Sequence, residues 1–395
     1  IKEKFLGIIN LGSTNAESIT NAFETFLVAK VIKLSNCLFI ALDGANVMSG
    51  ETSGVQRRMI LHAPHSVYIN CRNHRLALVF VHLLKKYDNL KSVDSVLVSL
   101  WKMFHYSPEK SQVFKDIQGE VYNIKTLKML KVSVTRWLSH GKACERVITR
   151  YHQLVEALDA LFVKNKEPEV KGIREQLLNP QVLLTLLFLS DFLGKVDKLN
   201  LWLQSPAIAF SSVSSQVSKL VDEVLDFSKN IEKANHFKKS RELLSFALDC
   251  TALSRSSRSS SKSYDSIELI KIYKETFVKP FIKDFENEME NAFIIPAPLN
   301  GFDLFSDKNI SGDNDASWQT LLSFYGKEKC HEFRGSKNIS APIIDETVAQ
   351  IEISGFEKEM SSAKLTYEME KMKEAQVFIR QGKLELAKKE DVGSN

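Results

Sequence analysis

Between Asp88 and about residue 340, apolar residues recur every three or four positions. That spacing is typical of amphipathic helices, and it predicts no strand within the stretch. Glycine and proline are also scarce, with 16 and 9 among 395 residues, so few turns interrupt the chain. The sequence therefore predicts a helix-rich protein and excludes an all-β fold.

The first 87 residues follow a different pattern, in which short apolar runs alternate with segments of helical spacing. The continuous run Cys37–Leu42 is typical of a strand covered on both faces. Helices are expected after Asn15, where Ile19 and Phe23 have helical spacing, and from Arg72 to Tyr87. The strands expected here are Phe5–Leu11, Cys37–Leu42 and Val67–Cys71. Strands separated by helices imply crossover connections, so a partly parallel α/β sheet is predicted.

Three parts follow from these patterns: an α/β part at 1–87, a helical part at 88–340, and a returning helix with a charged helical tail at 341–395. Within the helical part, Asn179 followed by Pro180 predicts a helix start. Two polar segments, 254–263 and 300–317, predict mobile loops.

The charge, the cysteines and the apolar runs of the sequence indicate which partners and which compartment suit the protein. The net charge of +5 is too small to name one, but two stretches are locally basic. Residues 51–86 carry six Lys/Arg against one acid, and residues 101–150 carry ten against four. The five scattered cysteines suit a reducing compartment. Because the longest apolar run, Val182–Leu189, is too short to span a bilayer, no membrane association is expected.

The segment that begins at Asp43 reads D-G-A-N-V-M-S-G and is followed by Gly54-Val55. It resembles the second-aspartate segment of hAT-family DNA transposases, D-G-A-x-x-M-x-G with a downstream G-V. Two further segments arrive in the family's order: Cys71-Arg72-Asn73-His74 resembles its C-x-x-H element, and Thr135-Arg136-Trp137 resembles its T-R-W element. The resemblance is strong over residues 5–140, moderate to residue 205 and weak beyond.

The resemblance implies a ribonuclease-H-like core with an incomplete sheet, interrupted by a large all-α insertion. It also implies an Asp-Asp-Glu triad that gathers Mg²⁺ for DNA strand cleavage, because hard cations need oxygen ligands. Asp43 matches the second acid, and Glu352 is assigned as the third, with Glu346 and Asp345 as competitors. The first Asp belongs to a strand that has no counterpart in this sequence.

Other site residues follow from the same resemblance. Cys71, His74, Arg136 and Trp137 are expected near the active site, where an aromatic ring can stack on an unpaired base. Basic side chains expected to contact DNA are Arg57, Arg58, Arg72 and Arg75. His62, His65, Cys71 and His74 also have spacing that invites a zinc hypothesis, but no zinc site is expected, because the family element already accounts for Cys71 and His74.

Two functional readings remain open. The first is a nuclear, transposase-derived nuclease-fold protein that binds DNA and is inactive in cleavage, since two acids hold two Mg²⁺ ions poorly. The second is a domesticated transposon relic that serves as a protein- or DNA-binding module in transcriptional regulation, with protein partners docking on the helical insertion.

Overall fold

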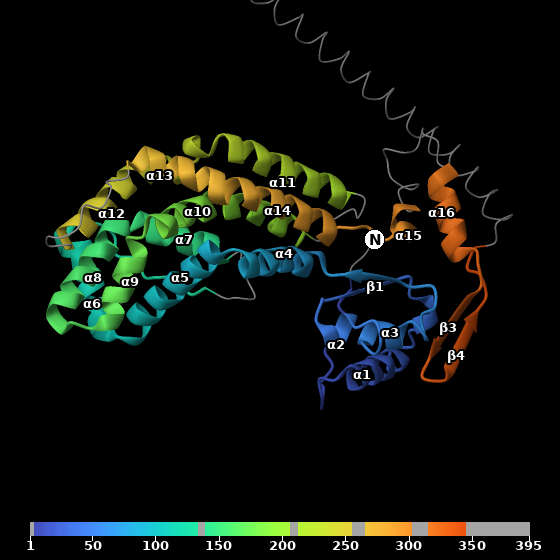
Figure 1. Ribbon diagram of the computed structural model, residues 1–395. Helices are drawn as coiled ribbons and strands as arrows, with labels where there is room; N and C mark the ends of the chain where they lie inside the picture. Colours follow the sequence, from blue (N-terminus) through green and yellow to red (C-terminus); the bar gives the residue numbers. More distant parts are fainter. Residues whose placement is uncertain (1–3, 133–138, 206–211, 255–264, 302–314, 345–395) are drawn as a thin grey trace, which may run out of the picture. The chain divides into compact units, whose positions relative to one another are not determined.

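The computed structural model describes residues 4–132, 139–205, 212–254, 265–301 and 315–344 (Figure 1). The chain divides into two compact units. One, the α/β unit, comprises residues 1–69 and 295–395, and the other, the helical unit, comprises residues 70–294. The prediction of a helix-rich chain is confirmed, since the described strands form only two small sheets.

The α/β unit begins with a helix whose start the sequence identifies. Asn15 caps it, because its side-chain oxygen accepts a hydrogen bond from the Ser18 N–H at 2.8 Å. The elements before the helical unit are α1 (Ala16–Ala29), η1 (Leu34–Asn36), β1 (Phe39–Leu42), α2 (Asn46–Ser49), α3 (Val55–Met59) and β2 (Val67–Asn70). Those after it are α15 (Ala297–Gly301), α16 (Asp315–Tyr325), β3 (Lys329–Phe333) and β4 (Ser336–Ser340).

Strands β1 and β2 lie where the sequence places them, and they pair with each other in a two-stranded sheet. The strand expected at Phe5–Leu11 is wrong, because these residues have no regular secondary structure and Phe5 and Ile8 are 82% and 87% exposed. Strand β1 is also not covered on both faces. Ile40 is buried, but Phe39 is exposed.

A hairpin of β3 and β4 contradicts the expectation that no strand occurs before residue 340. The two strands pair antiparallel, with Phe333 opposite Ser336. The two residues between them, Arg334 and Gly335, both have positive φ, at 52° and 83°. Such a turn matches the right-handed twist of paired strands, which explains why the chain reverses here.

Polar contacts attach this hairpin to the segment between α3 and β2. The His331 ring donates to the Pro64 carbonyl at 3.0 Å, and the His65 ring donates to the Ala341 carbonyl at 2.8 Å. The Asn338 amide donates to the Leu61 carbonyl. The apolar core of this unit is small, with Ile40, Val55, Met59 and Ala63 fully buried beneath α1.

The helical unit consists of helices that pack around α10. In chain order its elements are α4 (Arg72–Lys86), α5 (Asp88–Tyr106), α6 (Pro108–Asp116), η2 (Ile117–Val121), α7 (Ser139–Thr149), α8 (Tyr151–Asn165), α9 (Pro168–Leu177), α10 (Pro180–Trp202), α11 (Ser212–Lys229), η3 (Ile231–Lys233), η4 (Phe237–Lys239), α12 (Ser240–Ser254), α13 (Ser266–Tyr273), η5 (Lys274–Val278) and α14 (Lys279–Ala292). The elements η2 and η5 are π-helical turns.

Helix α10 starts where the sequence predicts, with the Asn179 side chain accepting from the Gln181 N–H at 2.9 Å and Pro180 at the first position. It is apolar on nearly all sides and packs against α5, α7, α11 and α12. Within the described part of the chain, no single helix has the length and apolar character of a membrane span. Helices α9 and α10 together have that length and apolar character, but the chain bends by 64° between them.

Aromatic rings fill the centre of the helical unit. Phe188, Phe192 and Phe281 contact one another with ring centroids 5.2–5.3 Å apart. Figure 1 shows α14, which carries Phe281, running beside α11 and α4. Helix α4 therefore packs within the helical unit, so the α/β segment ends at residue 69 instead of 87.

The other boundaries also differ from those expected. The chain leaves the helical unit at residue 294, well before residue 340. The ends of the expected loop at 300–317 are helical, in α15 and α16, and Ser254 ends α12. The remainder of both loops, and the returning helix and tail from residue 345, lie outside the described residues.

Candidate functional site

Asp43 directly follows β1 and is exposed. Its Oδ1 atom accepts a hydrogen bond from the Ala45 N–H at 2.9 Å, which closes a turn between the strand and α2. The Ser49 hydroxyl steadies the same turn by donating to the Gly44 and Ala45 carbonyls, at 3.1 Å each. An exposed carboxylate in a fixed turn is chemically able to serve as an oxygen ligand for a hard cation.

The two glycines that follow Asp43 have a packing role. A Cβ added at Gly54 would lie 2.5 Å from the backbone nitrogen of Gly50, and one added at Gly50 would lie 2.6 Å from the Asn46 carbonyl oxygen. The Gly54 N–H also donates to the Gly50 carbonyl at 3.0 Å. Close backbone contact between α2 and α3 thus accounts for the glycines of this segment without any ligand.

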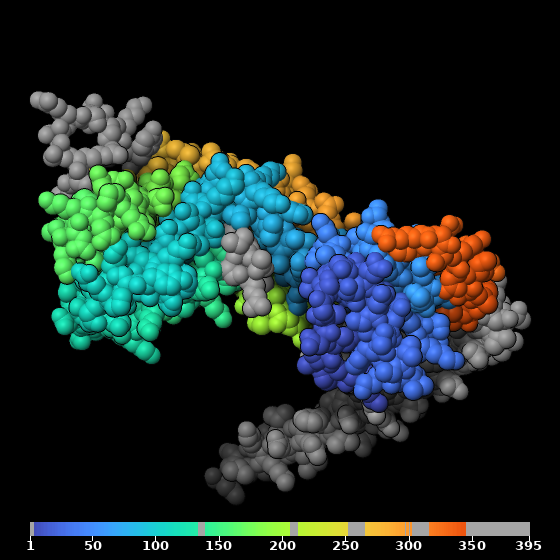
Figure 2. Space-filling model, turned by 90° about the horizontal axis from the view of Figure 1, so that it is seen from below, coloured from blue at the N-terminus to red at the C-terminus, as the bar shows by residue number. Residues whose placement is uncertain are grey.

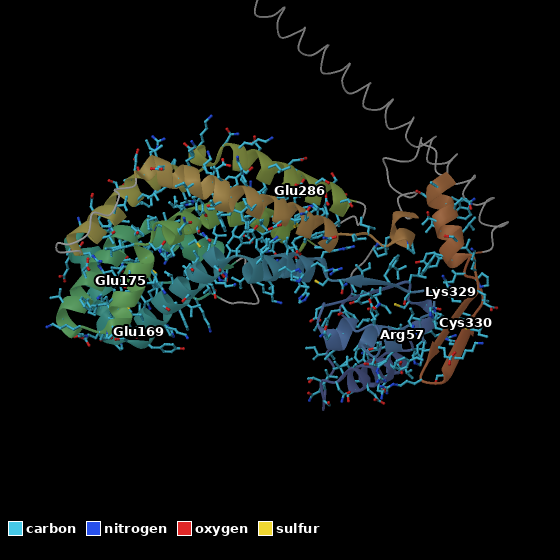
Figure 3. The ribbon with its side chains drawn as sticks, viewed as in Figure 1. Arg57, Glu169, Glu175, Glu286, Lys329 and Cys330 are labelled. Carbon is cyan, nitrogen blue, oxygen red and sulfur yellow. The ribbon has the colours of Figure 1, made fainter. Side chains whose placement is uncertain are left out.

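Arg57 and Arg58, which are expected to contact DNA, have partners within the α/β unit. Arg57 Nη2 donates to the Glu332 carbonyl at 2.8 Å, and Figure 3 shows Arg57 on the side of α3 that faces β3. Arg58 donates to the Ser53 carbonyl at 3.2 Å, and its guanidinium lies 5.3 Å from the centre of the Phe333 ring. Both side chains therefore help to hold the hairpin against α3.

Cys71, Arg72, His74 and Arg75 belong to the start of α4 in the helical unit. Cys71 is the N-terminal capping residue, although its side chain makes no capping hydrogen bond. Arg72 donates to the Ile294 carbonyl at 3.4 Å, and burial, together with the neighbouring charge of Arg75, lowers the pKa of its guanidinium. The Nε atom of Arg75 is buried and lacks a hydrogen-bond partner in the described part of the chain.

The histidines of the zinc hypothesis are divided among different partners. His62 pairs with Glu24 at 3.0 Å, while His65 donates to Ala341. Among the described residues, no three His, Cys, Asp or Glu side chains are grouped so that they could hold a metal ion.

Several expected site residues cannot be placed. Arg136 and Trp137 lie outside the described residues, and so do the candidates for the third acid, Asp345, Glu346 and Glu352. Asp43 belongs to the α/β unit, and the C-x-x-H element belongs to the helical unit.

The basic stretch 101–150 separates into two kinds of side chain. Three of its cations have internal partners: Lys110 pairs with Glu167, Arg146 donates to the Lys128 carbonyl at 2.6 Å, and Arg150 donates to the Lys125 carbonyl at 2.9 Å. Six lysines make no ion pair with any described residue, and all except the half-buried Lys115 are exposed. We call them the unpaired lysines: Lys102, Lys115, Lys125, Lys128, Lys131 and Lys142.

The sequence predicts that the basic residues of 51–86 and 101–150 bind DNA, but the individual DNA contacts expected from it are the four arginines of the first stretch. The unpaired lysines outnumber the acids of the same described stretch that lack an ion pair, Asp116, Glu120 and Glu145. Helix α5, which carries Lys102, lies on the face of the helical unit seen in Figure 2, where it is coloured cyan. Lysines that are exposed and lack a carboxylate partner attract polyanions.

No protein-family model matches the chain, and no solved structure matches it.

Proposed function

We propose that this chain is a DNA-binding protein of the hAT-transposase-derived type, acting in the nucleus. The observation that carries DNA binding is the set of unpaired lysines in the helical unit. A lysine that already pairs with a carboxylate gains little binding free energy from a phosphate. Contact between an unpaired lysine and the DNA backbone releases counterions that are condensed on the DNA. The contact is sequence-independent, because phosphates carry no base information.

The transposase-derived origin rests on the motif that begins at Asp43 and on the order of the segments after it. In this proposal, β1 and β2 belong to a ribonuclease-H-like sheet, and the helical unit is the insertion. Asp43 at the carboxyl end of a strand agrees with such a site, since sheets of this class present functional groups at strand ends.

We propose binding without strand cleavage. The resemblance assigns two acids of the triad, Asp43 and Glu352, and two-metal catalysis uses carboxylates to clamp both the attacking and the leaving oxygen. With fewer carboxylates, Mg²⁺ is held poorly. Asp43 itself would then serve the turn that it closes with Ala45.

The experiment is a binding titration of the full chain with a fluorescently labelled DNA duplex, followed by anisotropy at several salt concentrations. We expect the logarithm of the association constant to fall linearly with the logarithm of salt, with a slope of about −0.9 for each phosphate contacted. Two duplexes of unrelated sequence should bind with equal affinity. An affinity that stays constant between about 50 and 200 mM salt would contradict the proposal.

A further inference from the structure

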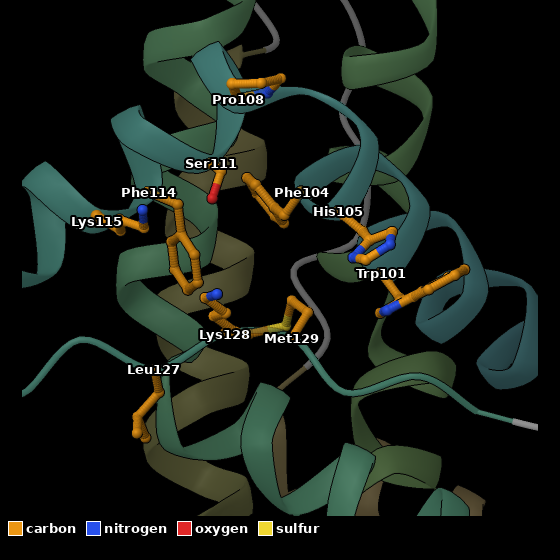
Figure 4. Close-up of a pocket in the computed structure, with 10 residues that line it drawn as sticks. All are labelled: Trp101, Phe104, His105, Pro108, Ser111, Phe114, Lys115, Leu127, Lys128 and Met129. Carbon is orange, nitrogen blue, oxygen red and sulfur yellow. The ribbon is translucent and has the colours of Figure 1, made fainter.

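A pocket of about 170 Å³ opens in the helical unit where α5 and α6 meet the extended segment 125–129 (Figure 4). The turn between the two helices is tight, because Ser107 caps α6 by accepting from the Lys110 N–H at 3.2 Å and Pro108 occupies the first helical position. This turn brings the aromatic end of α5 against the first turns of α6.

The floor of the pocket is aromatic. Phe104 and Phe114 stack with ring centroids 4.9 Å apart, and both are buried. Trp101 stacks on the ring of His105 at 4.7 Å and also lines the pocket. Met129 adds a flexible apolar wall. Such a lining favours a flat aromatic molecule.

The pocket's polar groups are cationic or neutral. Lys115 and Lys128 line it, and Lys131 lies 5.1 Å from the centre of the Trp101 ring. The described residues that line it include no acid, and the Ser111 hydroxyl offers a donor and an acceptor. Because none of these lysines pairs with a carboxylate in the described part of the chain, the ligand is expected to supply the negative charge.

The wall formed by residues 125–129 is held in place by the side chains of one buried residue and two half-buried arginines. Gln118, which is fully buried, accepts from the Leu127 N–H at 2.9 Å and donates to the Leu127 carbonyl at 3.3 Å. Arg150 reaches both Gln118 and the Lys125 carbonyl, and Arg146 holds the Lys128 carbonyl. The segment lacks regular secondary structure, yet its backbone is fixed, so the pocket is preformed.

The geometry points to a binding site for a single nucleotide unit, with the base against the aromatic floor and the phosphate on Lys115 and Lys128. The volume suits one planar ring system, because pockets for larger ligands run to roughly 300–1,000 Å³. Stacking on aromatic side chains with lysines along the backbone is how proteins hold unpaired bases. The inference rests on the proposed function, to which it adds recognition of an unpaired nucleotide.

Two ligands carry the base and phosphate that this pocket would bind: a free mononucleotide and a nucleotide within a single DNA strand. Binding of dAMP and of inorganic phosphate to the full chain would be measured by isothermal titration calorimetry, and binding of labelled oligothymidylate by anisotropy. We expect dAMP to bind and inorganic phosphate to bind at least about fivefold more weakly, because phosphate cannot use the aromatic floor. If oligothymidylate competes with dAMP, the strand is a source of the ligand; if it does not, the source is the free nucleotide.

Two variants test whether the pocket is the site. Lys128→Gln removes a cation from the pocket, and Ser111→Leu fills it without changing the charge. The matched control is Lys91→Gln, because Lys91 is ten residues along α5 from Trp101, about 15 Å in a helix. We expect each pocket variant to weaken dAMP binding at least about fivefold and the control to leave it unchanged. Circular dichroism checks that each variant is folded.

Equal binding of dAMP by Ser111→Leu and the wild-type protein would overturn the inference, as would phosphate binding as tight as dAMP binding. Failure of the proposed function looks different. If duplex DNA binds with salt sensitivity while dAMP does not bind, only the pocket inference fails. If dAMP binds and duplex DNA does not, only the proposed duplex binding fails.

Discussion

The side chain of Gln118 holds the backbone of Leu127 through two hydrogen bonds, one at 2.9 Å to its N–H and one at 3.3 Å to its carbonyl. These two hydrogen bonds replace the backbone hydrogen bonds that a neighbouring strand would provide. They fix against η2 an extended segment that carries two of the unpaired lysines, Lys125 and Lys128.

Replacing Gln118 with Ala should therefore destabilise the protein and weaken nucleotide binding together. The change leaves the Leu127 N–H without its acceptor, which costs about 2 kcal/mol in a buried site. Urea unfolding measures the loss. The control is Gln112→Ala, since Gln112 is exposed and bonds only to Asp116 among the described residues, and it should change stability by less than about 0.5 kcal/mol. Equal losses for the two variants would contradict the assigned role of Gln118.

Gly54→Ala should destabilise the α/β unit by about 2 kcal/mol or more. The added Cβ would lie 2.5 Å from the nitrogen and 2.6 Å from the oxygen of Gly50, and neither backbone atom can move away easily. Gly12→Ala is the control, because a Cβ at that position meets no described atom within 4 Å. Thermal unfolding of the two variants provides the comparison, and a Gly54→Ala variant as stable as Gly12→Ala would show that α2 and α3 do not pack this closely.

The contact between α4 and α14 predicts a loss of stability in acid. Asp284 accepts from the Tyr87 hydroxyl and pairs with Lys86 at 2.6 Å. Burial would raise the pKa of Asp284, but the hydrogen bonds from Lys86 and Tyr87 outweigh it and hold that pKa below its ordinary value of 3.8. Since the folded-state pKa is lowered, the stabilisation is present above pH about 4 and is lost as the pH falls through the folded-state pKa.

Asp284→Asn should consequently unfold at lower urea than the wild-type protein at pH 7, with a difference of about 1 kcal/mol. The difference should shrink as the pH falls below about 4. Asp88→Asn serves as the control, because Asp88 is 90% exposed where it pairs with Lys91 and should matter little at either pH. A difference at Asp284 that does not depend on pH would contradict the ionic contribution.

Catalysis gives a separate prediction. Incubated with supercoiled DNA and Mg²⁺ or Mn²⁺, the 395-residue chain should produce no nicked product, and Asp43→Asn should behave identically. The reason is the count of carboxylates that the resemblance assigns, Asp43 and Glu352. Nicking by the unaltered chain that Asp43→Asn abolishes would show that other acids complete the site.

The helices of this chain could be predicted because their signals are local. Asn15 and the pair Asn179-Pro180 identify helix starts, and each cap forms as its residue type predicts. The hairpin was missed because its strands, K-C-H-E-F and S-K-N-I-S, are short and polar. The sequence signal for the hairpin is the dipeptide Arg334-Gly335, because a glycine in a two-residue connection between short strands favours a tight turn.

The other errors depend on tertiary contacts that a single sequence does not contain. Phe5–Leu11 is apolar enough for a strand, but a strand needs a neighbouring strand to pair with. Among the strands that the structure describes, β1 and β2 pair only with each other. Helix α4 was assigned to the α/β part by its position after β2, although its buried face packs on α14. Arginines 57 and 58 look like free cations in the sequence, and their partners Glu332 and Phe333 lie about 275 residues away.

DNA binding through the unpaired lysines is tested most directly by the salt dependence of two triple variants. One is Lys102→Gln, Lys125→Gln and Lys142→Gln, which removes three unpaired lysines. The control is Lys91→Gln, Lys164→Gln and Lys279→Gln, which removes the same charge from lysines paired with Asp88, Glu109 and Glu275. We predict that the first variant makes the salt slope of duplex binding shallower by about one for each lysine that contacts a phosphate, while the control leaves the slope unchanged. Equal slopes for the two variants would contradict the account.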